Sequence, residues 1–472
     1  MAESNKLGYE KISKLLLSLA IPSIIAQLVN MLYNMVDRIY IGQMNNGTTA
    51  MAALSVTLPI ITFITAFTQL VGTGGAPLCA IRLGENKKDK AEEIMTNSFS
   101  LLLMMGITLT VIILVLKEPL LYLFGATEQT IQPAIEYITI YALGTVFVQL
   151  TLGMNSYINT QGFAKIGMRT VIIGAVLNII LDPIFIFILD MGVSGAALAT
   201  IISQGVSALW VMKFLFSKKS FIKIRKQYLK PKLSISLSIM GLGISPFVMS
   251  ATESFLQISF NNQLSLFGGT MAIATMSILT SLWQFITLPL QGLCQGAQPI
   301  MSYNYGANNY TRVRNTFKLL FKLCVGFSCV VGFLIIFFSD FFVSIFTNDI
   351  ETVKFASWAL KVYIAGSVLF GAQIACQQSF MALGQAKISL TMAIFRKIIL
   401  LIPLIYIFPF IFKDTSIAIM CAEGIMNMVN DGTRVFAVLF AEPVSDVLAA
   451  LTTSTMFYRF YKKSLCLEDK KL

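Results

Sequence analysis

Histidine is absent from this chain of 472 residues, and charged residues make up only 12% of it. Without histidine, the chain lacks the usual imidazole metal ligands and the Ser-His-Asp type of catalysis. A soluble domain carries about a quarter charged residues, whereas 56% of this chain is hydrophobic. These proportions exclude an ordinary soluble protein and indicate a membrane protein.

The chain also has no GxxxxGK[ST] phosphate loop and no CxxC spacing. We therefore expect no enzyme, no cofactor and no ATP hydrolysis, so an ion gradient must drive any pumping. Cysteine in apolar segments behaves as a small hydrophobe, and we predict no disulfide among the seven cysteines, which are Cys79, Cys294, Cys324, Cys329, Cys376, Cys421 and Cys466.

Apolar runs of roughly 20 residues or more, long enough to cross a bilayer as helices, recur between short polar breaks. They predict an all-α membrane protein with twelve transmembrane helices, near 15–38, 51–81, 94–116, 133–160, 166–189, 193–216, 233–260, 270–300, 315–338, 352–382, 388–411 and 435–458.

The basic residues predict the orientation, because cytoplasmic flanks attract positive charge during insertion. With both termini in the cytoplasm, 29 of the 35 basic residues fall on that side. The richest stretch is FSKKSFIKIRKQYLKPK, between spans six and seven. The net charge of +12 therefore reflects topology, and we expect no nucleic-acid partner. The six exceptions are Arg38, Lys117, Lys354, Lys361, Lys413 and Arg434.

The second half of the sequence repeats the first at a constant offset of 222 residues. The offset aligns Phe63, Gln69, Gly74, Pro77, Gly84, Asn86, Gly162 and Ala164 with Phe285, Gln291, Gly296, Pro299, Gly306, Asn308, Gly384 and Ala386. We predict a duplicated six-helix unit: an N lobe (1–216), a cytoplasmic linker (217–232) and a C lobe (233–472). Because six spans is an even number, the two lobes are parallel and related by a pseudo-twofold axis along the membrane normal.

Polar side chains line one face of the first span. Gln27, Asn30, Asn34 and Asp37 are spaced three, four and three residues apart, so they share one face of the helix. We expect this polar face not to contact lipid. We predict that this face borders a wet central cavity. The alternative is that such residues only tie neighbouring helices together.

An asparagine and an aspartate, Asn178 and Asp182, stand four residues apart in the fifth span, LNIILDP. An ionised carboxylate in a membrane is expensive and is usually retained for function. Asp182 can take up a proton, or it can hold Na⁺ with the neutral oxygens of Asn178 and of Thr200 in the sixth span. Pro183 directly behind Asp182 permits a kink.

The second half has similar polar stripes with fewer charges. Gln284 and Gln291 lie in span eight, and Glu253 lies in span seven. We predict that these residues line the cavity, where Glu253 is a coupling site, a drug counter-ion or a helix tie.

The run IPSIIAQLVNMLYNMVDRIYIG, the repeated Gly/Pro motif ending spans two and eight, LNIILDPIFI and AEPVSD together resemble the multidrug and toxic compound extrusion (MATE) family. The details of span one resemble its MepA-like bacterial branch. The resemblance implies a cation-coupled antiporter, driven by H⁺ or Na⁺, that exports cationic amphipathic drugs by alternating access. It further implies a monomer in the bilayer of a bacterial plasma membrane.

By the same resemblance, the coupling residues are Asp37, Asn178, Asp182 and Thr200, which are also the candidate Na⁺ site. The polar position before the acid of span one falls on Asn30. A family tyrosine of span four falls on Tyr137 or on the nearby Tyr141. The C-lobe acid of span seven falls on Glu253, but span ten has no matching acid, so the N lobe is the better candidate for coupling.

Two other functions fit the sequence less well. A lipid-linked oligosaccharide flippase of the same superfamily has additional spans and a strongly cationic cavity, whereas the intramembrane charges singled out in this sequence are acidic. A channel would leak ions without exchanging a drug.

Overall fold

The computed structural model describes residues 6–44, 46–413, 415–426 and 428–466, and the regular elements in this described part are helices. Packing divides the chain into two compact units. The first comprises residues 1–250, 295–313 and 381–387, and the second comprises 251–294, 314–380 and 388–472. The predicted lobe boundaries follow topology instead of packing and stay a prediction.

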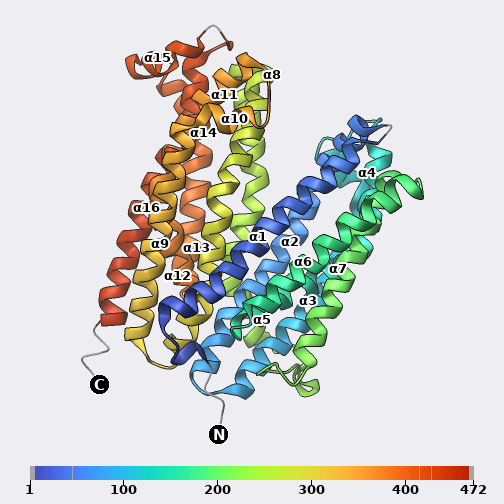
Figure 1. Ribbon diagram of the computed structural model, residues 1–472, viewed down its shortest axis with the longest axis vertical. Coiled ribbons are helices and arrows are strands. Elements are labelled where there is room, and N and C mark those ends of the chain that lie inside the picture. The colour runs from blue at the N-terminus through green and yellow to red at the C-terminus, as the bar shows by residue number, and fades with distance from the viewer. Residues whose placement is uncertain (1–5, 45, 414, 427, 467–472) are drawn as a thin grey trace. The chain divides into compact units, whose positions relative to one another are not determined.

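The first unit contains the helices of the N-terminal half (Figure 1). They are α1 (Ile12–Gly42), α2 (Gly47–Gly84), α3 (Lys88–Leu123), α4 (Ile131–Leu143), α5 (Thr145–Thr160), α6 (Ala164–Pro183), the π-helix η2 (Ile184–Ile188) and α7 (Gly192–Phe216).

The remaining helices supply the second unit and parts of the first. They are α8 (Leu233–Gly306), α9 (Tyr310–Phe337), α10 (Ser339–Ser344), α11 (Ile350–Tyr363), α12 (Ser367–Ala382), α13 (Ala386–Ile394), the π-helix η4 (Phe395–Leu401), α14 (Ile402–Ile411), α15 (Ser416–Ala422), α16 (Gly432–Phe460) and the π-helix η6 (Tyr461–Cys466).

The described residues contain 9 helices long and apolar enough to cross a membrane, or 11 if each bent pair forms one span. The bent pairs are α4 with α5, at 54°, and α11 with α12, at 47°. The 74-residue α8 is broken at Gly269, whose φ of 66° and ψ of −158° are not helical. It therefore covers two predicted spans, 233–260 and 270–300, which gives the twelve predicted. The all-α membrane fold is confirmed.

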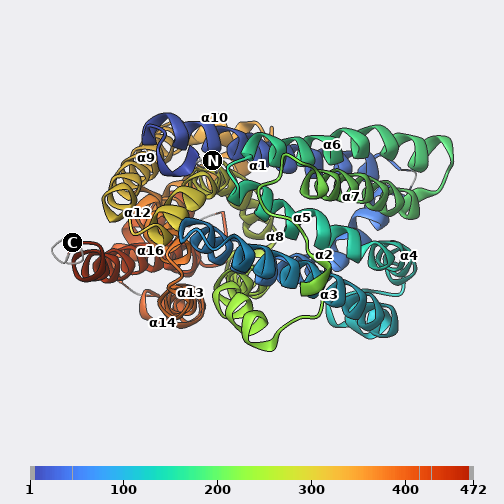
Figure 2. The ribbon, with the colours of Figure 1, turned by 90° about the horizontal axis from the view of Figure 1, so that it is seen from below.

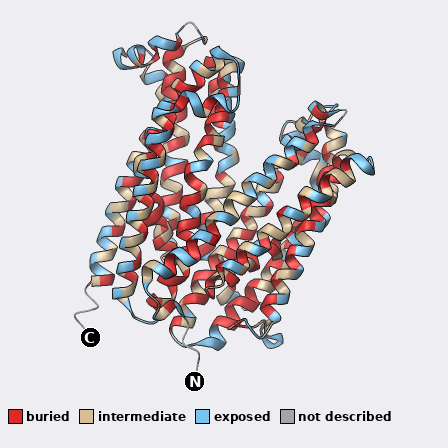
Figure 3. Ribbon diagram, in the orientation of Figure 1, coloured by how far each residue is buried: buried red, intermediate tan, exposed pale blue. Residues whose placement is uncertain are grey.

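Large apolar side chains cover much of the exposed surface, as a lipid-facing surface requires. Along the spanning helices, exposed and buried stretches alternate (Figure 3). Val115 is 72% exposed, Ile188 75% and Phe337 78%. A soluble protein rarely exposes so many large apolar side chains, whereas in a bilayer these side chains contact acyl chains.

The 222-residue repeat recurs in the helix boundaries. Helix α5 (145–160) has its counterpart in α12 (367–382), and α6 and α13 begin at the equivalent residues Ala164 and Ala386. The unusual backbone angles repeat as well. Asn86 and Asn308 have φ of 60° and 57°, and Gly162 and Gly384 have φ of 87° and 73°. The duplicated sequence therefore folds twice in the same way.

Two equivalent glycines, Gly84 of α2 and Gly306 of α8, form a reciprocal contact inside the first unit. A β-carbon at Gly84 would lie 1.9 Å from the Tyr303 carbonyl oxygen, and one at Gly306 would lie 2.0 Å from the Ile81 carbonyl oxygen. Tyr303 is the repeat equivalent of Ile81. The same pair of positions thus meets twice, as at a twofold axis, and only glycine allows the two backbones to approach so closely.

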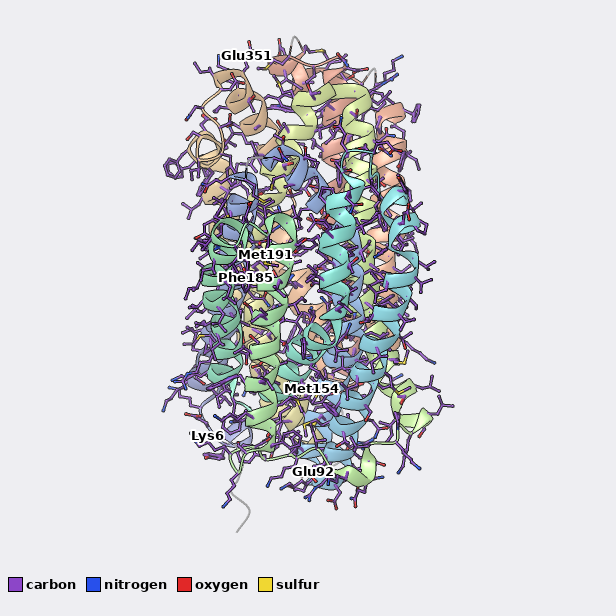
Figure 4. All side chains as sticks on the ribbon, turned by 90° about the vertical axis from the view of Figure 1, so that its right-hand side faces the viewer. Lys6, Glu92, Met154, Phe185, Met191 and Glu351 are labelled. Atoms are coloured by element: carbon purple, nitrogen blue, oxygen red, sulfur yellow. The ribbon has the colours of Figure 1, made fainter. Side chains whose placement is uncertain are left out.

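The linker is docked along the beginning of α3. The Glu92 carboxylate accepts hydrogen bonds from the Lys223 backbone N–H, at 3.1 Å, and from Arg225 Nε, at 2.6 Å. Asn97 Oδ1 accepts from the backbone N–H of Lys232, at 2.7 Å. Glu92 lies near one end of the first unit (Figure 4). The linker therefore follows a fixed course at this end.

The segment between α14 and α16 contains the short helix α15 (Ser416–Ala422), which the sequence does not predict. Thr415 caps its first turn by accepting from the Ala418 N–H, and the Trp358 indole of α11 donates to the Cys421 carbonyl at 2.8 Å. The Asp431 N–H donates to the Phe267 carbonyl at 2.9 Å. These contacts hold the segment against neighbouring helices of the second unit.

Candidate functional site

Helices α1, α6 and α7 lie side by side in the first unit and carry the predicted coupling residues (Figure 2). Helix α6 ends at Pro183, which has no N–H to continue the helical pattern, and the wider π-helix η2 follows. Gly195 of α7 lets that helix approach the turn, because a β-carbon there would lie 2.8 Å from the Phe185 carbonyl carbon. The proline and this close packing fix the level of Asp182.

Asn178 is at the centre of the cluster. Its Nδ2 donates to Asp182 Oδ1 at 3.2 Å and to Thr200 Oγ1 at 3.3 Å. Asn178, Asp182 and Thr200 are 1%, 0% and 7% exposed. The amide therefore joins the acid of α6 to the hydroxyl of α7 in a buried setting.

Asp37 of α1 completes the cluster, and its side chain is buried too. Its carboxyl group lies within hydrogen-bonding reach of that of Asp182. Two carboxyl groups hydrogen-bond to each other only when one carries a proton, because an ionised carboxylate has no donor. A shared proton also removes the repulsion between two negative charges.

Several oxygens of this cluster are buried without a hydrogen-bond donor among the described residues. They are Asp37 Oδ1, Asp182 Oδ2 and Asn178 Oδ1. Buried acceptors usually have a partner. This set of hard oxygen atoms fits a proton, and together with Thr200 Oγ1 it also fits a small cation such as Na⁺.

A polar cavity of about 30 Å³ adjoins the cluster, between α1, α5, α6 and α7. Asn30 and Tyr33 of α1 line it together with Asn178 and Thr200. Its volume accommodates one or two water molecules. The cavity therefore brings Asn30 next to the predicted coupling residues.

The other predicted residues of the first unit lie around the cluster. Asn34 is exposed and donates from Nδ2 to the Asn30 carbonyl at 2.8 Å. Tyr137 and Tyr141 are both buried and stacked, with ring centroids 6.1 Å apart. Both tyrosines belong to one buried pair, so the pair does not single out either residue.

The predicted residues of the second unit do not form one site. Gln284 and Gln291 are exposed on α8. Glu253, whose side chain is 59% exposed, forms an ion pair with the ammonium group of Lys397, whose side chain is only 8% exposed. Glu253 is thus a partner of a buried cation in addition to any role toward a substrate.

Arg396 forms a buried ionic cluster in the second unit, which the sequence analysis did not predict. Its Nη2 donates to Asp446 Oδ1 at 2.7 Å and to Glu442 Oε1 at 3.2 Å, and its Nε donates to Asp446 Oδ1 at 3.0 Å. The guanidinium also lies over the ring of Phe370, 4.9 Å from the centroid. Arg396, Glu442 and Asp446 are at most 7% exposed.

Comparison with known proteins identifies the family of this chain. Residues 22–184 and 246–407 each match the MatE family model. One match falls in each half, and the starts of the two matches differ by 224 residues, close to the internal offset. The family model therefore matches each copy of the internal repeat separately.

The curated relatives include multidrug export proteins. The Multidrug export protein MepA of Staphylococcus saprophyticus is 29% identical over 423 residues, which cover 88% of this chain and 92% of that protein. The MepA protein of Staphylococcus haemolyticus is 28% identical over 413 residues, which cover 86% and 89%. The resemblance to the MepA-like branch is confirmed.

Solved structures share the fold. One, described as the outward-facing conformation of a multidrug resistance MATE family transporter of the MOP superfamily, has a TM-score of 0.87 at 23% identity, covering 98% of this chain and 99% of that one. A MOP superfamily transporter from Pyrococcus furiosus has a TM-score of 0.85 at 22% identity, covering 97% and 98%.

Proposed function

Because the chain belongs to the MatE family, we propose that it exports cationic, amphipathic drugs and other toxic compounds in exchange for H⁺ or Na⁺. It does so by alternating access, as a monomer in a bacterial plasma membrane with both termini in the cytoplasm. The relatives named as multidrug export proteins cover most of the chain and support the drug substrates.

The observation that carries cation coupling is the pair of buried carboxyl groups, Asp37 and Asp182. A coupling ion must bind at a site that is stable both loaded and empty. The contact between the two carboxyl groups stabilises the protonated pair, and Asn178 stabilises Asp182 by donating to it. This geometry favours H⁺, and Na⁺ bound by the same oxygens is the second candidate.

Coupling follows from a change of charge at α1 and α6. When the pair holds a proton, Asp37 and Asp182 attract each other, and α1 packs against α6. When the proton leaves, the charges repel and attract a cation instead. A cationic drug and the coupling ion thereby compete for one negative charge, which makes the exchange obligatory.

Substrate contacts are proposed at Asn30 and Asn34 of α1, at Tyr137, and at Glu253, Gln284 and Gln291 of α8. The exposed side chains of Gln284 and Gln291 are available to a ligand. The flippase alternative has no observation in its favour, since the cluster of Asp37 and Asp182 is acidic, not cationic.

The test is ethidium efflux from energised cells that express the wild type, Asp182→Asn or Asp37→Asn at equal levels. We expect each neutral variant to lose at least about tenfold in efflux rate, because proton transfer by a positioned group contributes that much or more. Asp190→Asn is the matched control, because Asp190 is exposed at the turn after η2 and its φ of 50° suits asparagine.

The two gradients are collapsed separately in the same assay. Loss of efflux with the proton gradient alone identifies H⁺, and loss with the sodium gradient alone identifies Na⁺. Efflux by Asp182→Asn and Asp37→Asn at the wild-type rate would show that the carboxyl pair is structural and would remove the basis for coupling at this site.

A further inference from the structure

The polar cavity beside Asn178 continues toward the end of α6 that begins at Ala164. Besides Asn30 and Tyr33, it is lined by the polar side chains of Thr151, Thr170, Ser203, Gln204 and Ser207. Thr170 and Ser207 each lie about two helical turns from Asn178 and Thr200 along their own helices. The cavity therefore extends along α6 and α7 away from the acids.

Polar atoms in the wall of the cavity lack a partner within the described part of the chain. Ser203 Oγ and Gln204 Oε1 are buried without a hydrogen bond, as is Asn178 Oδ1. Ser203 and Asn178 are 2% and 1% exposed. A buried water needs two to four polar partners and enough room, and this cavity offers both.

The polar track continues along α5 beyond the cavity. Thr151, Asn155 and Asn159 are spaced by four residues and share one helical face. Asn155 Oδ1 and Asn159 Oδ1 are again buried without a partner among the described residues. A β-carbon at Gly167 would lie 2.2 Å from Asn159 Oδ1, so glycine leaves that oxygen its place between α5 and α6.

Other polar groups of the wall already have one hydrogen bond. Thr151 Oγ1 donates to the Gln204 carbonyl at 2.9 Å, and Ser207 Oγ donates to the Thr170 carbonyl at 3.2 Å. Each hydroxyl oxygen retains acceptor capacity for water. The track is thus a series of hydroxyl and amide groups on α5, α6 and α7.

From this arrangement we propose that the cavity holds water and that this water, with the hydroxyl groups around it, carries protons from the Asp37–Asp182 pair as far as Thr170 and Ser207, toward the end of the bundle where α6 begins at Ala164. The proposal rests on the proposed function, H⁺-coupled export, and adds the route by which the ion leaves. That end is predicted to be cytoplasmic.

Each step is a proton hop, after which the hydroxyl groups and water must turn back before the next proton passes. A water or hydroxyl accepts a proton on one lone pair and passes its own proton to the next oxygen, so no bond other than O–H is made or broken. Thr200 is the cavity hydroxyl tied to the acid, because the Asn178 amide donates to both Thr200 and Asp182, and water carries the proton between Thr200 and the carboxylate. An amide cannot relay a proton in this way, and Asn178 acts as a positioning residue.

The titratable and charged groups that face the upper end of the path come from α1, α4 and α6. Tyr33 itself lines the cavity. Tyr33, Tyr137 and Tyr141 are close enough to interact electrostatically with one another or with the two aspartates. The full set consists of Tyr33, Asp37, Arg38, Tyr137, Tyr141 and Asp182.

Residues labelled in the side view show in which direction along the first unit the path runs. In the side view, Met154 of α5 lies above Glu92, and Phe185 and Met191 lie higher still (Figure 4). Going from Phe185, just after α6, to Met154 of α5 therefore leads toward the end of the unit where Glu92 lies.

The test compares Ser203→Val with Ser203→Thr in proteoliposomes that contain a pH-sensitive dye. The two substituents have nearly the same shape, but only threonine keeps the hydroxyl. We expect Ser203→Val to lower the drug-driven proton flux by at least about tenfold, while Ser203→Thr restores most of it. Leu209→Ala, on a side chain of α7 that is 72% exposed, is the control and should leave the flux unchanged.

Ethidium binding and the melting temperature are measured on the same proteins, and we expect wild-type values for both, since Ser203 is not among the proposed substrate contacts. Equal flux in Ser203→Val and Ser203→Thr, with wild-type exchange intact, would overturn the path but leave the proposed function standing. A wild type that exports ethidium without moving protons would overturn both.

A second measurement does not depend on the stability of the variants. A wild-type structure at a resolution that shows ordered water should contain density between Ser203 and Thr170. An empty cavity there would overturn the proposal.

Discussion

Arg396 donates hydrogen bonds to two buried carboxylates, so its removal would leave Glu442 and Asp446 as unpaired charges. We predict that Arg396→Ala lowers the free energy of unfolding by about 3–5 kcal/mol, the usual cost of breaking a buried pair. Arg82→Ala is the control, because Arg82 forms a half-exposed pair with Glu85 and should cost less than about 1 kcal/mol. Unfolding in detergent, followed by tryptophan fluorescence, measures both.

A triple variant separates charge from packing. Arg396→Met with Glu442→Gln and Asp446→Asn removes all three charges, and we expect it to recover much of the stability lost in Arg396→Ala. If Arg396→Ala is no less stable than Arg82→Ala, the cluster is not a stabilising ion network.

The residues of the N-terminal cluster could be named from the sequence, since LNIILDP indicates Asn178 and Asp182 with Thr200, and the resemblance to the MATE family adds Asp37. Their contacts with each other still needed the fold. The Arg396 cluster was missed. Arg396 and Lys397 are buried and say nothing about orientation, so 27 of the 35 basic residues support the predicted cytoplasmic side instead of 29. The spacing of Glu442 and Asp446, four apart in an apolar run, was the available signal.

At the scale of elements, α2 and α8 meet at Gly84 and Gly306 without side chains between them. We predict that Gly306→Ala or Gly84→Ala lowers the free energy of unfolding by about 1–3 kcal/mol, since the added methyl group meets a backbone carbonyl that cannot turn away.

Gly326→Ala in α9 is the matched control, because a β-carbon there meets nothing within 4 Å. It should be neutral or stabilising, since alanine favours a helix over glycine. Thermal unfolding of the purified proteins compares the three variants. Equal melting temperatures would argue against a tight contact between α2 and α8.

The first turn of α11 depends on Asp349. Its carboxylate accepts from the Thr352 N–H at 3.0 Å and from the Thr352 hydroxyl, and these hydrogen bonds lower the pKa of Asp349 below its ordinary value of 3.8. A lowered pKa in the folded state means that the cap is fully stabilising above 3.8 and is lost as the pH falls through the folded-state value.

We therefore predict that the amide protons of Thr352 and Val353 exchange faster in Asp349→Ala than in the wild type at pH 7. The difference should shrink as the pH is lowered below 3.8. Hydrogen exchange with mass spectrometry measures it. The Val353 N–H also donates to the Asp349 carbonyl, at 2.8 Å, and the variant keeps that carbonyl, so equal exchange in the variant and the wild type would assign the protection to the backbone alone.

Elements could be predicted wherever a long apolar run ends in polar residues, which is why the spans near 233–260 and 270–300 match the two parts of α8. Helix α15 could not, because it is only 7 residues long and its stability comes from contacts such as Trp358 with Cys421. The bends between α4 and α5 and between α11 and α12 also depend on packing and not on a proline at the break.

At the scale of the whole molecule, the orientation in the membrane is open to a direct test. We predict that Lys226→Cys in a cysteine-free background is protected from a membrane-impermeant maleimide in intact cells, whereas Lys413→Cys is labelled. Both side chains are exposed, so access depends only on the side of the membrane. Permeabilised cells, in which both should react, are the control, and the reverse pattern would place the termini outside.

The repeat is the part of the whole-molecule architecture that the sequence predicts best, since one offset aligns identities across several helices and loops. The sequence could not show that the offset also preserves backbone angles, as at Asn86 and Asn308, or that the linker is fixed to α3 through Glu92. Those features depend on contacts between segments that are distant in the chain.

The reciprocal contact of Gly84 with Gly306 has a consequence for ancestry. A surface that meets its own equivalent needs no second sequence to complement it, so a single gene of half the present length would already encode both sides. Two copies of that shorter chain could pair in the same membrane, provided that they inserted with the same orientation. After the two genes fused, the halves could diverge in sequence. One half now has Asp182 and the other has Arg396, while the two glycines keep the contact between α2 and α8.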